Sequence, residues 1–386
     1  MQQADYRIAP YRPEYIPKII EVQRNLWGSN AELSAAFLDW KYLRNPYVSE
    51  PLIYLAMQGE RAVGMRGFVG ARWEFGSPRQ TLVLPLAADM VIAPDHRNRG
   101  LMALIMKAAL KDMAQKGYKY VVSIEARPIT LLSQMTMGWR QVGSLEPMEC
   151  RVTRSESLPR VRRFLRKSRL VVSVYRGLHN LARKTPAAPP ESRADHFDVL
   201  DSTSSRCNQR LSRHVAIEKA PRTRDMAELA SRLDNDVRIR HVRDDEYYAW
   251  RFHNPRSKYR FLFWHNTKME GYLVLQATAF PSTEPIRIID WEATSDQVRL
   301  ELLKSAIQLA PDRSLVTWSA TLGGKERRIL EAVGFKRLDH TATMNRSAAV
   351  VRPVCDEMLR KEWLLGSQRL LDIGNWDFRM IHSRGF

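Results

Sequence analysis

Two arginines and a glycine lie together where an expected strand meets an expected helix. In the stretch from Asp89 to Met102, Arg97 and Arg99 precede Gly100, and an apolar-periodic segment follows. The first turn of a helix carries the positive end of the helix dipole, so two arginines there require a compensating anion. A pyrophosphate would serve, because the unpaired N–H groups of that turn point at it and Gly100 lets it approach the backbone. The same short motif also suits a solvated basic loop, so its setting must decide between the two.

The elements around this loop occur twice in the chain. Phe37 to Pro46 precedes an apolar strand at Ile53 to Met57, and Tyr247 to Pro255 precedes one at Phe261 to Trp264. Both blocks carry a tryptophan followed by a basic and an aromatic residue, and both end in Asn-Pro. A duplication explains this repeated order better than chance does.

Each half continues with a strand, a helix, a strand and a short helix that ends in glycine and an aromatic residue. In the first half these elements are Leu82 to Ala93, Leu101 to Lys116, Tyr118 to Ala126 and Ile129 to Met137. The alternation after an initial meander predicts an α/β fold (α+β mixed sheet) with helices on both faces of each sheet.

Length and composition predict two domains. The chain has 386 residues, too many for one ordinary core, and its 44% hydrophobic and 27% charged residues are typical of a globular protein. We expect a first domain at residues 1–150, a connector at 151–200, a second domain at 201–345 and a tail at 346–386. The tail carries three large aromatic residues, which we expect to pack on the second domain.

The connector concentrates the positive charge. The chain has a formal charge of +19, and between Arg151 and Lys184 eleven lysines and arginines stand against one acid, Glu156. Apolar residues recur there at helical spacing, which predicts a basic amphipathic helix over residues 158–183. Such a helix suits an anionic membrane surface, or it packs between the halves with its arginines solvated. Nucleic acid is a disfavoured partner, because no known nucleic-acid motif occurs and aromatic residues do not alternate with the basic ones on one face.

We expect a cytoplasmic protein, and the basic helix would place it at the inner face of the membrane. The N-terminus lacks a basic region followed by an apolar stretch, and no window holds eighteen uninterrupted apolar residues. Cys150, Cys207 and Cys355 lie far apart, which excludes a CxxC metal knuckle and leaves an odd number for a disulfide framework. We expect no metal.

The loop, its strand–helix setting and the Gly138-Trp139 pair resemble the GNAT acetyltransferase superfamily. Its loop pattern, R/Q-x-x-G-x-G/A, is matched from Arg97 except at Met102, which replaces a small residue. With the Trp40 to Pro46 block, the chain is most similar to tandem GNAT proteins among surface-polysaccharide and amino-sugar acyltransferases, and more loosely to aminoglycoside and lysine acetyltransferases. The resemblance implies two tandem GNAT-like domains, the second degenerate.

The resemblance also implies the substrates. The donor is acetyl-CoA or another acyl-CoA, and the acceptor is a primary amine of a small molecule or glycan, such as an amino sugar of a polysaccharide or lipid-linked precursor. The residues that it assigns to the donor are Val91, Ile92, Arg97, Asn98, Arg99, Gly100, Leu101 and Met102.

The GNAT fold splays two parallel strands so that the pantetheine lies between them and a freed N–H polarises the thioester. A carboxylate must take the proton of the amine, and Asp89 and Glu125 are the candidates. Asp89 could instead tie down the loop, and Glu125 could pair with Arg127. Many members use a tyrosine as the acid, but this chain has Gln134 at that position. Ser133, water or unaided departure of the thiolate must replace that acid.

The second half has no donor loop. Between Thr294 and Val298 there is no basic residue and no glycine, so this copy should not bind CoA. Asp290, Trp291 and Glu292 either frame the acceptor cleft or are ordinary strand residues. Two other functions stay open: a FemABX-like, tRNA-dependent aminoacyltransferase, against which Arg97-x-x-Gly100 speaks, and a non-catalytic protein that binds acyl-CoA or a membrane.

Overall fold

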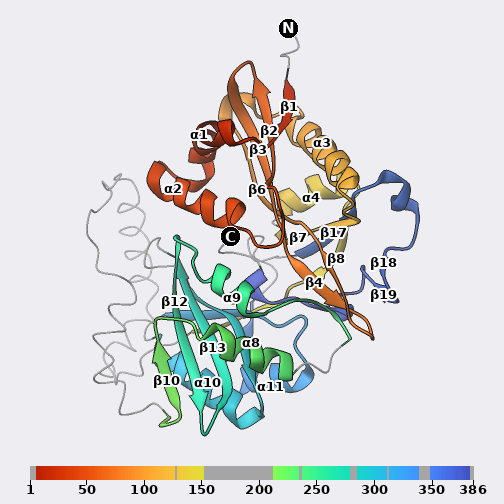
Figure 1. Cartoon of the computed structure of the whole chain (residues 1–386). Helices are drawn as coiled ribbons and strands as arrows, with labels where there is room; N and C mark the ends of the chain where they lie inside the picture. The colour runs from red at the N-terminus through yellow and green to blue at the C-terminus, as the bar shows by residue number, and fades with distance from the viewer. Residues whose placement is uncertain are drawn as a thin grey trace, which may run out of the picture.

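The computed structural model describes residues 6–126, 128–151, 212–233, 237–278, 285–310, 313–338 and 348–382. In this part the chain forms two seven-stranded mixed sheets, drawn one above the other in Figure 1. The predicted basic helix at 158–183 lies outside the described residues. Within those ranges, none of the helices combines the length and apolar character needed to cross a bilayer.

The first sheet has the order β1-β2-β3-β6-β7-β17-β8, with only β6 and β7 parallel. Its strands are β1 (Arg7–Pro10), β2 (Leu52–Gln58), β3 (Arg61–Val69), β6 (Leu86–Ile92), β7 (Tyr120–Ala126), β17 (Ala348–Pro353) and β8 (Arg140–Ser144). The helical elements that cover it are η1 (Pro13–Tyr15), α1 (Ile16–Trp27), α2 (Ala31–Leu38), the π-helical turn η2 (Asp39–Leu43), η3 (Pro94–His96), α3 (Leu101–Gln115) and α4 (Pro128–Thr136).

The second sheet repeats this arrangement as β10-β12-β13-β14-β15-β9-β16, again with one parallel pair, β14 and β15. Its strands are β10 (Val215–Glu218), β12 (Ser257–His265), β13 (Met269–Thr278), β14 (Ile286–Ala293), β15 (Ser314–Trp318), β9 (Pro147–Arg151) and β16 (Lys336–Arg337). Its helices are α8 (Thr223–Arg232), α9 (Asp245–Arg251), α10 (Asp296–Gln308) and α11 (Gly324–Ala332). The predicted duplication and the mixed α/β fold are therefore confirmed.

One expected strand is wrong. Leu82 to Ala93 is not continuous, because Pro85 has no N–H to donate to a ladder. The chain breaks there into β5 (Gln80–Val83) and β6. β5 belongs to a separate four-stranded sheet with β4 (Arg72–Phe75), β11 (Ile239–His241) and β20 (Trp376–Asp377), which joins segments from both halves and the C-terminal region.

The two halves exchange a strand. β9, the last strand of the first half, lies between β15 and β16 of the second sheet. In return β17, which follows the second half, lies between β7 and β8 of the first sheet. Each sheet is therefore completed by a strand from the other half, and neither sequence half forms its sheet alone. The division of the chain at residues 150 and 346 remains a prediction.

The aromatic residues of the tail predicted that it packs on the second domain. Instead it packs on both halves. β17 is an inner strand of the first sheet. Trp363 lies under the Arg140 guanidinium at 4.7 Å, and Trp376 packs edge-on against Trp73 at 5.3 Å. Its short elements are η4 (Asp356–Arg360), β18 (Leu364–Leu365), β19 (Gln368–Arg369), η5 (Ile373–Asn375) and η6 (Met380–His382). The expectation failed because these tryptophans find apolar surface on both halves.

A pseudo-twofold relation joins the halves at the repeated tryptophans. The Trp40 indole N–H donates to the carbonyl of Trp250 at 2.7 Å, and the Trp250 indole donates to the carbonyl of Trp40 at 2.8 Å. The two rings stack at 5.3 Å. Reciprocal contacts of this kind characterise an isologous interface. The first block has one more residue than the second before its Asn-Pro, and the π-helical turn η2 accommodates it.

Three apolar clusters form the core. The largest lies between the halves and combines residues of α1 and α2 with residues of α8 and α9. A second lies under α10 and α11, and a third lies under α3 beside Trp139. The face of the first sheet that carries α3 is thus the outer face, as Figure 1 also shows.

Candidate active site

The parallel strands β6 and β7 separate soon after they meet. Their ladder contains a single pair, Leu86 with Val122, next to the hydrogen bond from the Val122 N–H to the Pro85 carbonyl. Beyond this point β6 has no ladder partner on that side within the described residues, and Ala87 to Met90 are half-buried. This is the splay that the GNAT resemblance implies.

The loop after β6 leaves the start of α3 open. Gly100 adopts a left-handed conformation with φ of 73° directly before Leu101, and no side chain caps the helix. Asn98 is also left-handed, with φ of 61°. A Cβ on Gly100 would meet no atom within 4 Å, so the backbone there faces open space. The first-turn N–H groups of α3 can therefore donate hydrogen bonds to an anion.

The two loop arginines are exposed, and one hydrogen bond from Arg97 and two from Arg99 hold them in place. Arg97 donates from Nε to the Ile92 carbonyl at 3.3 Å, and Arg99 donates to the Asp95 carbonyl at 2.9 Å and to the Tyr6 hydroxyl at 3.2 Å. These contacts leave further guanidinium N–H groups for an anion.

The remaining predicted donor residues divide by orientation. Val91 packs in the cluster between the halves, whereas Ile92 packs toward the α3 side. Leu101 is buried and Met102 is half-buried. Val91 and Leu101 can therefore contribute only backbone groups to a donor, while Ile92 and Met102 can also contribute side-chain surface.

Asp89 lies in a buried ionic cluster that the sequence did not reveal. Its Oδ2 accepts hydrogen bonds from the Lys41 ammonium and the Tyr42 hydroxyl, each at 2.8 Å, while 10% of the Asp89 side chain is exposed. Lys41 and Tyr42 come from the π-helical turn η2. Among the described residues, no group hydrogen-bonds to the other carboxylate oxygen, Oδ1, which leaves it available to a substrate.

Burial shapes the electrostatics of this cluster. It lowers the pKa of Lys41, against the opposing effect of Asp89, and it raises the pKa of Tyr42, which the Asp89 charge raises further. Burial also lowers the pKa of Arg66, on the adjacent strand β3, to about 10. The available signal for Lys41 was its place in the repeated block, where the second half has Arg251.

The other two catalytic candidates are placed differently. Glu125 belongs to β7, but its side chain lies outside the described residues. Ser133 lies half-buried on α4. The side chains that bind Asp89 are Lys41 and Tyr42, not Ser133. Gln134, the next residue, is 1% exposed.

The second half closes the corresponding features. The Ser295 hydroxyl accepts a hydrogen bond from the Val298 N–H and so caps α10. Asp290 is fully buried, where Arg243 and the hydroxyls of Tyr248 and Tyr272 bind it at 2.8 to 2.9 Å. Asp290 therefore cannot line an acceptor cleft, because its carboxylate is satisfied inside the protein.

The C-terminal segment completes this closure. Arg379 donates to the Trp291 carbonyl at 2.7 Å and pairs with Glu292 at 2.9 Å. Trp291 is 5% exposed. Trp291 and Glu292 are thus held by the tail.

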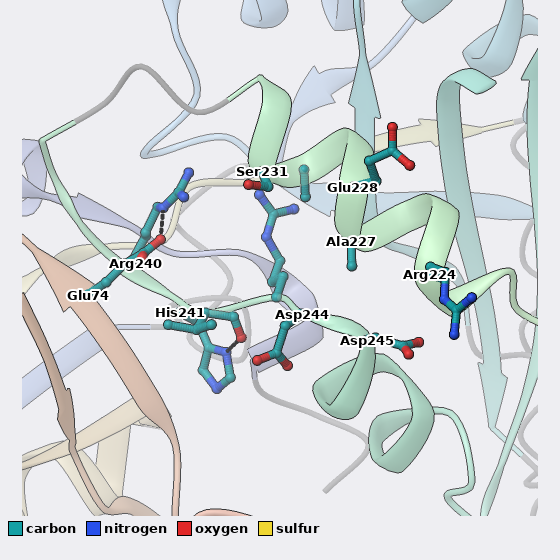
Figure 2. A pocket seen from close by; sticks show the side chains of 12 residues that line it. Glu74, Arg224, Ala227, Glu228, Ser231, Arg240, His241, Asp244 and Asp245 are labelled. Carbon is teal, nitrogen blue, oxygen red and sulfur yellow. Dashed lines mark hydrogen bonds and ion pairs between the residues drawn. The ribbon is translucent and has the colours of Figure 1, made fainter. Parts of the chain in front are cut away.

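A cavity of about 480 Å³ lies between α8 and the segment that leads into α9. Figure 2 shows Arg224, Ala227, Glu228 and Ser231 on α8 above Asp244 and Asp245. Its far wall is Glu74 of β4, bound by Arg240. None of the predicted site residues lines this cavity. In the described ranges, no group of three histidine, cysteine or acidic side chains could hold a metal ion.

The fold of the chain is that of known N-acyltransferases. A GCN5-related N-acetyltransferase from Anabaena variabilis aligns with a TM-score of 0.56 and 12% identity, over 91% of this chain and 73% of that one. Another, from Kribbella flavida, aligns with a TM-score of 0.51 and 12% identity, over 91% of this chain and 72% of that one. A probable N-acyltransferase from Enterococcus faecalis aligns with a TM-score of 0.51 and 10% identity, over 91% of this chain and 73% of that one. No curated protein sequence matches the chain.

The open helix end and the splayed strands belong to the half of the chain whose sequence marks it as an acyltransferase. The particular domain follows from the sequence: residues 7–131 match the acetyltransferase (GNAT) domain family. The reaction of this class is transfer of an acyl group from acyl-CoA to an amine.

Proposed function

We propose that this protein acylates the primary amine of an amino sugar, in a polysaccharide or a lipid-linked precursor, with acetyl-CoA or a longer acyl-CoA. The observation that carries the donor half of the proposal is the uncapped start of α3 at Gly100, beside two exposed arginines and the end of a splayed strand. The acceptor class rests on the sequence resemblance of the Trp40 to Pro46 block and the donor loop. The pyrophosphate binds the first turn of α3, and Arg97 and Arg99 neutralise its outer oxygens.

Asp89 is the proposed general base. Its Oδ1 takes the proton of the amine, directly or through a water, as the amine nitrogen attacks the thioester carbonyl. Lys41 and Tyr42 hold Oδ2 and so fix the direction of Oδ1. A strand N–H freed by the splay polarises the thioester carbonyl, and the C–S bond breaks to release the CoA thiolate. Glu125 and Ser133 remain secondary candidates for proton transfer.

The test is a thiol-release assay with acetyl-CoA and a panel of amines: amino sugars, aminoglycosides and lysine peptides. We expect an amino sugar to be the best acceptor. We also expect Asp89→Asn to lower kcat by about 100-fold or more, with little change in acetyl-CoA binding. Asp95→Asn is the matched control, because Asp95 is an exposed carboxylate in the same region that pairs with Arg61.

The outcomes separate the proposal from its alternatives. Equal rates for Asp89→Asn and Asp95→Asn would remove Asp89 from the mechanism. Turnover of lysine peptides or aminoglycosides alone would move the acceptor away from amino sugars. If acyl-CoA binds but no amine is acylated, the non-catalytic alternative is favoured. The proposed membrane association through residues 158–183 is tested separately, by sedimentation with anionic vesicles.

A further inference from the structure

Helix α4 carries a buried amide without a hydrogen-bond partner. Leu131 and Met137 pack against the apolar cluster under α3, and Gln134 lies between them, three residues from each. Gln134 is 1% exposed, yet neither Nε2 nor Oε1 has a partner among the described residues. A buried amide left in this state is costly, so the free protein keeps it at the expense of its own stability.

The equivalent residue of the second half is apolar. Gln134 and Leu330 each lie four residues before the glycine of the Gly-aromatic pair. Their carbonyls accept the same hydrogen bond, from the N–H of Trp139 at 3.2 Å and from that of Phe335 at 3.0 Å. Leu330 is fully buried in the second apolar cluster. The fold therefore accepts a leucine at this position, so packing alone does not require the glutamine.

A second polar group follows the same pattern. The indole N–H of Trp139 is buried and has no partner among the described residues, whereas the second half has Phe335. Both unsatisfied groups thus occur in the half with the open helix end, and both are replaced by apolar residues in the half where α10 is capped.

The residues on either side of Gln134 pack on the α3 side of the first sheet. Leu131 of α4 and Met137, which directly follows α4, pack against the cluster that contains Leu101 and Ile105 of α3. Met90 and Ile92 of β6 point into this same cluster and stay half-buried. The splay of β6 from β7 opens the sheet between these elements.

We propose that Gln134 binds an amide of the pantetheine arm of acyl-CoA. A carboxamide has one group of donors and one acceptor, and a secondary amide offers the complementary acceptor and donor. The Gln134 NH₂ donates to the carbonyl of the arm, and the N–H of the arm donates to Gln134 Oε1. A thioester offers only acceptors and would satisfy half of the residue. This inference rests on the acyl-CoA donor site proposed above.

The experiment is calorimetric binding of acetyl-CoA and of adenosine 3′,5′-bisphosphate, which has no pantetheine arm. The variant Gln134→Leu copies the second half and should fold with at least the stability of the parent, as followed by thermal unfolding. We expect its Kd for acetyl-CoA to rise by about 10-fold or more, the loss of two hydrogen bonds, while its Kd for the bisphosphate does not change. Thr136→Ala, two residues later on the helix and exposed, is the control and should bind both as the parent does.

Equal acetyl-CoA affinity in Gln134→Leu and the parent would overturn the inference while leaving the donor site in place. An equal loss of both ligands would also overturn it, because it would place the effect on the nucleotide end. If the parent itself binds neither ligand, the donor site fails and the inference fails with it.

Discussion

Helix α3 of the first half begins at a left-handed glycine without a cap, whereas α10 of the second half begins at Ser295, whose hydroxyl accepts from the Val298 N–H. The two helices follow equivalent strands of equivalent sheets. The two helices therefore differ in what accepts hydrogen bonds from their first-turn N–H groups. In α10 the Ser295 side chain accepts one of them, and in α3 these groups remain available to a ligand.

The equivalent aspartates differ in the same way. Gly64 pairs with Ile92 and Gly271 with Ala293, which makes Asp89 and Asp290 equivalent in the two sheets. Asp89 is 10% exposed with one oxygen free among the described residues, and Asp290 is 0% exposed and bonded on both oxygens. A duplicated domain can thus keep its sheet order while its polar groups become paired internally.

The largest effect should come from opening the closed half. Arg243→Met removes the guanidinium that bridges Asp290 and Glu292 at 2.8 and 2.6 Å. Asp290 would keep its two tyrosine hydroxyls but lose its nearest cation, and breaking this buried ion pair should lower the free energy of unfolding by about 3 to 5 kcal/mol. Arg97→Met in the exposed donor loop should change it by less than about 0.5 kcal/mol. Urea unfolding followed by circular dichroism measures both, and similar losses would refute the contrast.

Acid should weaken the junction between the tail and the second half next. His241 and His382 stack at 4.7 Å, and burial lowers the pKa of His241 to about 3 and that of His382 well below its usual value. Both are neutral when folded, and both would take up a proton near pH 6.5 when unfolded. Their contribution to stability is complete above pH 6.5 and is lost as the pH falls toward 3.

For His241 alone, the free energy of unfolding should fall by about 2 to 3 kcal/mol between pH 6.5 and 4.5. His241→Phe should flatten this dependence, even if it lowers stability at pH 7 by removing the hydrogen bond to the Val242 carbonyl. Urea unfolding at a series of pH values measures the slope, and an unchanged slope would contradict the proposed titration.

Local patterns gave the duplication and the donor loop, because Trp40, Asn45 and Gly100 lie in blocks where spacing along the chain carries the signal. The strand exchange was not predictable, because the local sequence of β9 and β17 does not indicate which sheet each strand joins. Asp89 looked like a free base because its partner Lys41 lies 48 residues away. The sequence left open whether Asp290 frames a cleft or is an ordinary strand residue, because its partners come from α9, β13 and the segment before α9.

The smallest effects concern the two helix starts. Ser295→Ala should lower the free energy of unfolding by about 1 kcal/mol through loss of the cap, and the KM for acyl-CoA should not change. Gly100→Ala should cost a similar amount, because φ is 73° there, and should also raise that KM. Thermal unfolding and initial rates together distinguish them. A raised KM in Ser295→Ala would mean that the second half contacts the donor.

The chain should have a single donor site, at the start of α3. Isothermal titration calorimetry of the full chain with acetyl-CoA tests it through the stoichiometry, beside the variant Arg97→Glu, Gly100→Glu. We expect one acetyl-CoA per chain in the parent and none in the variant. Two sites per chain, or binding that survives in the variant, would contradict it.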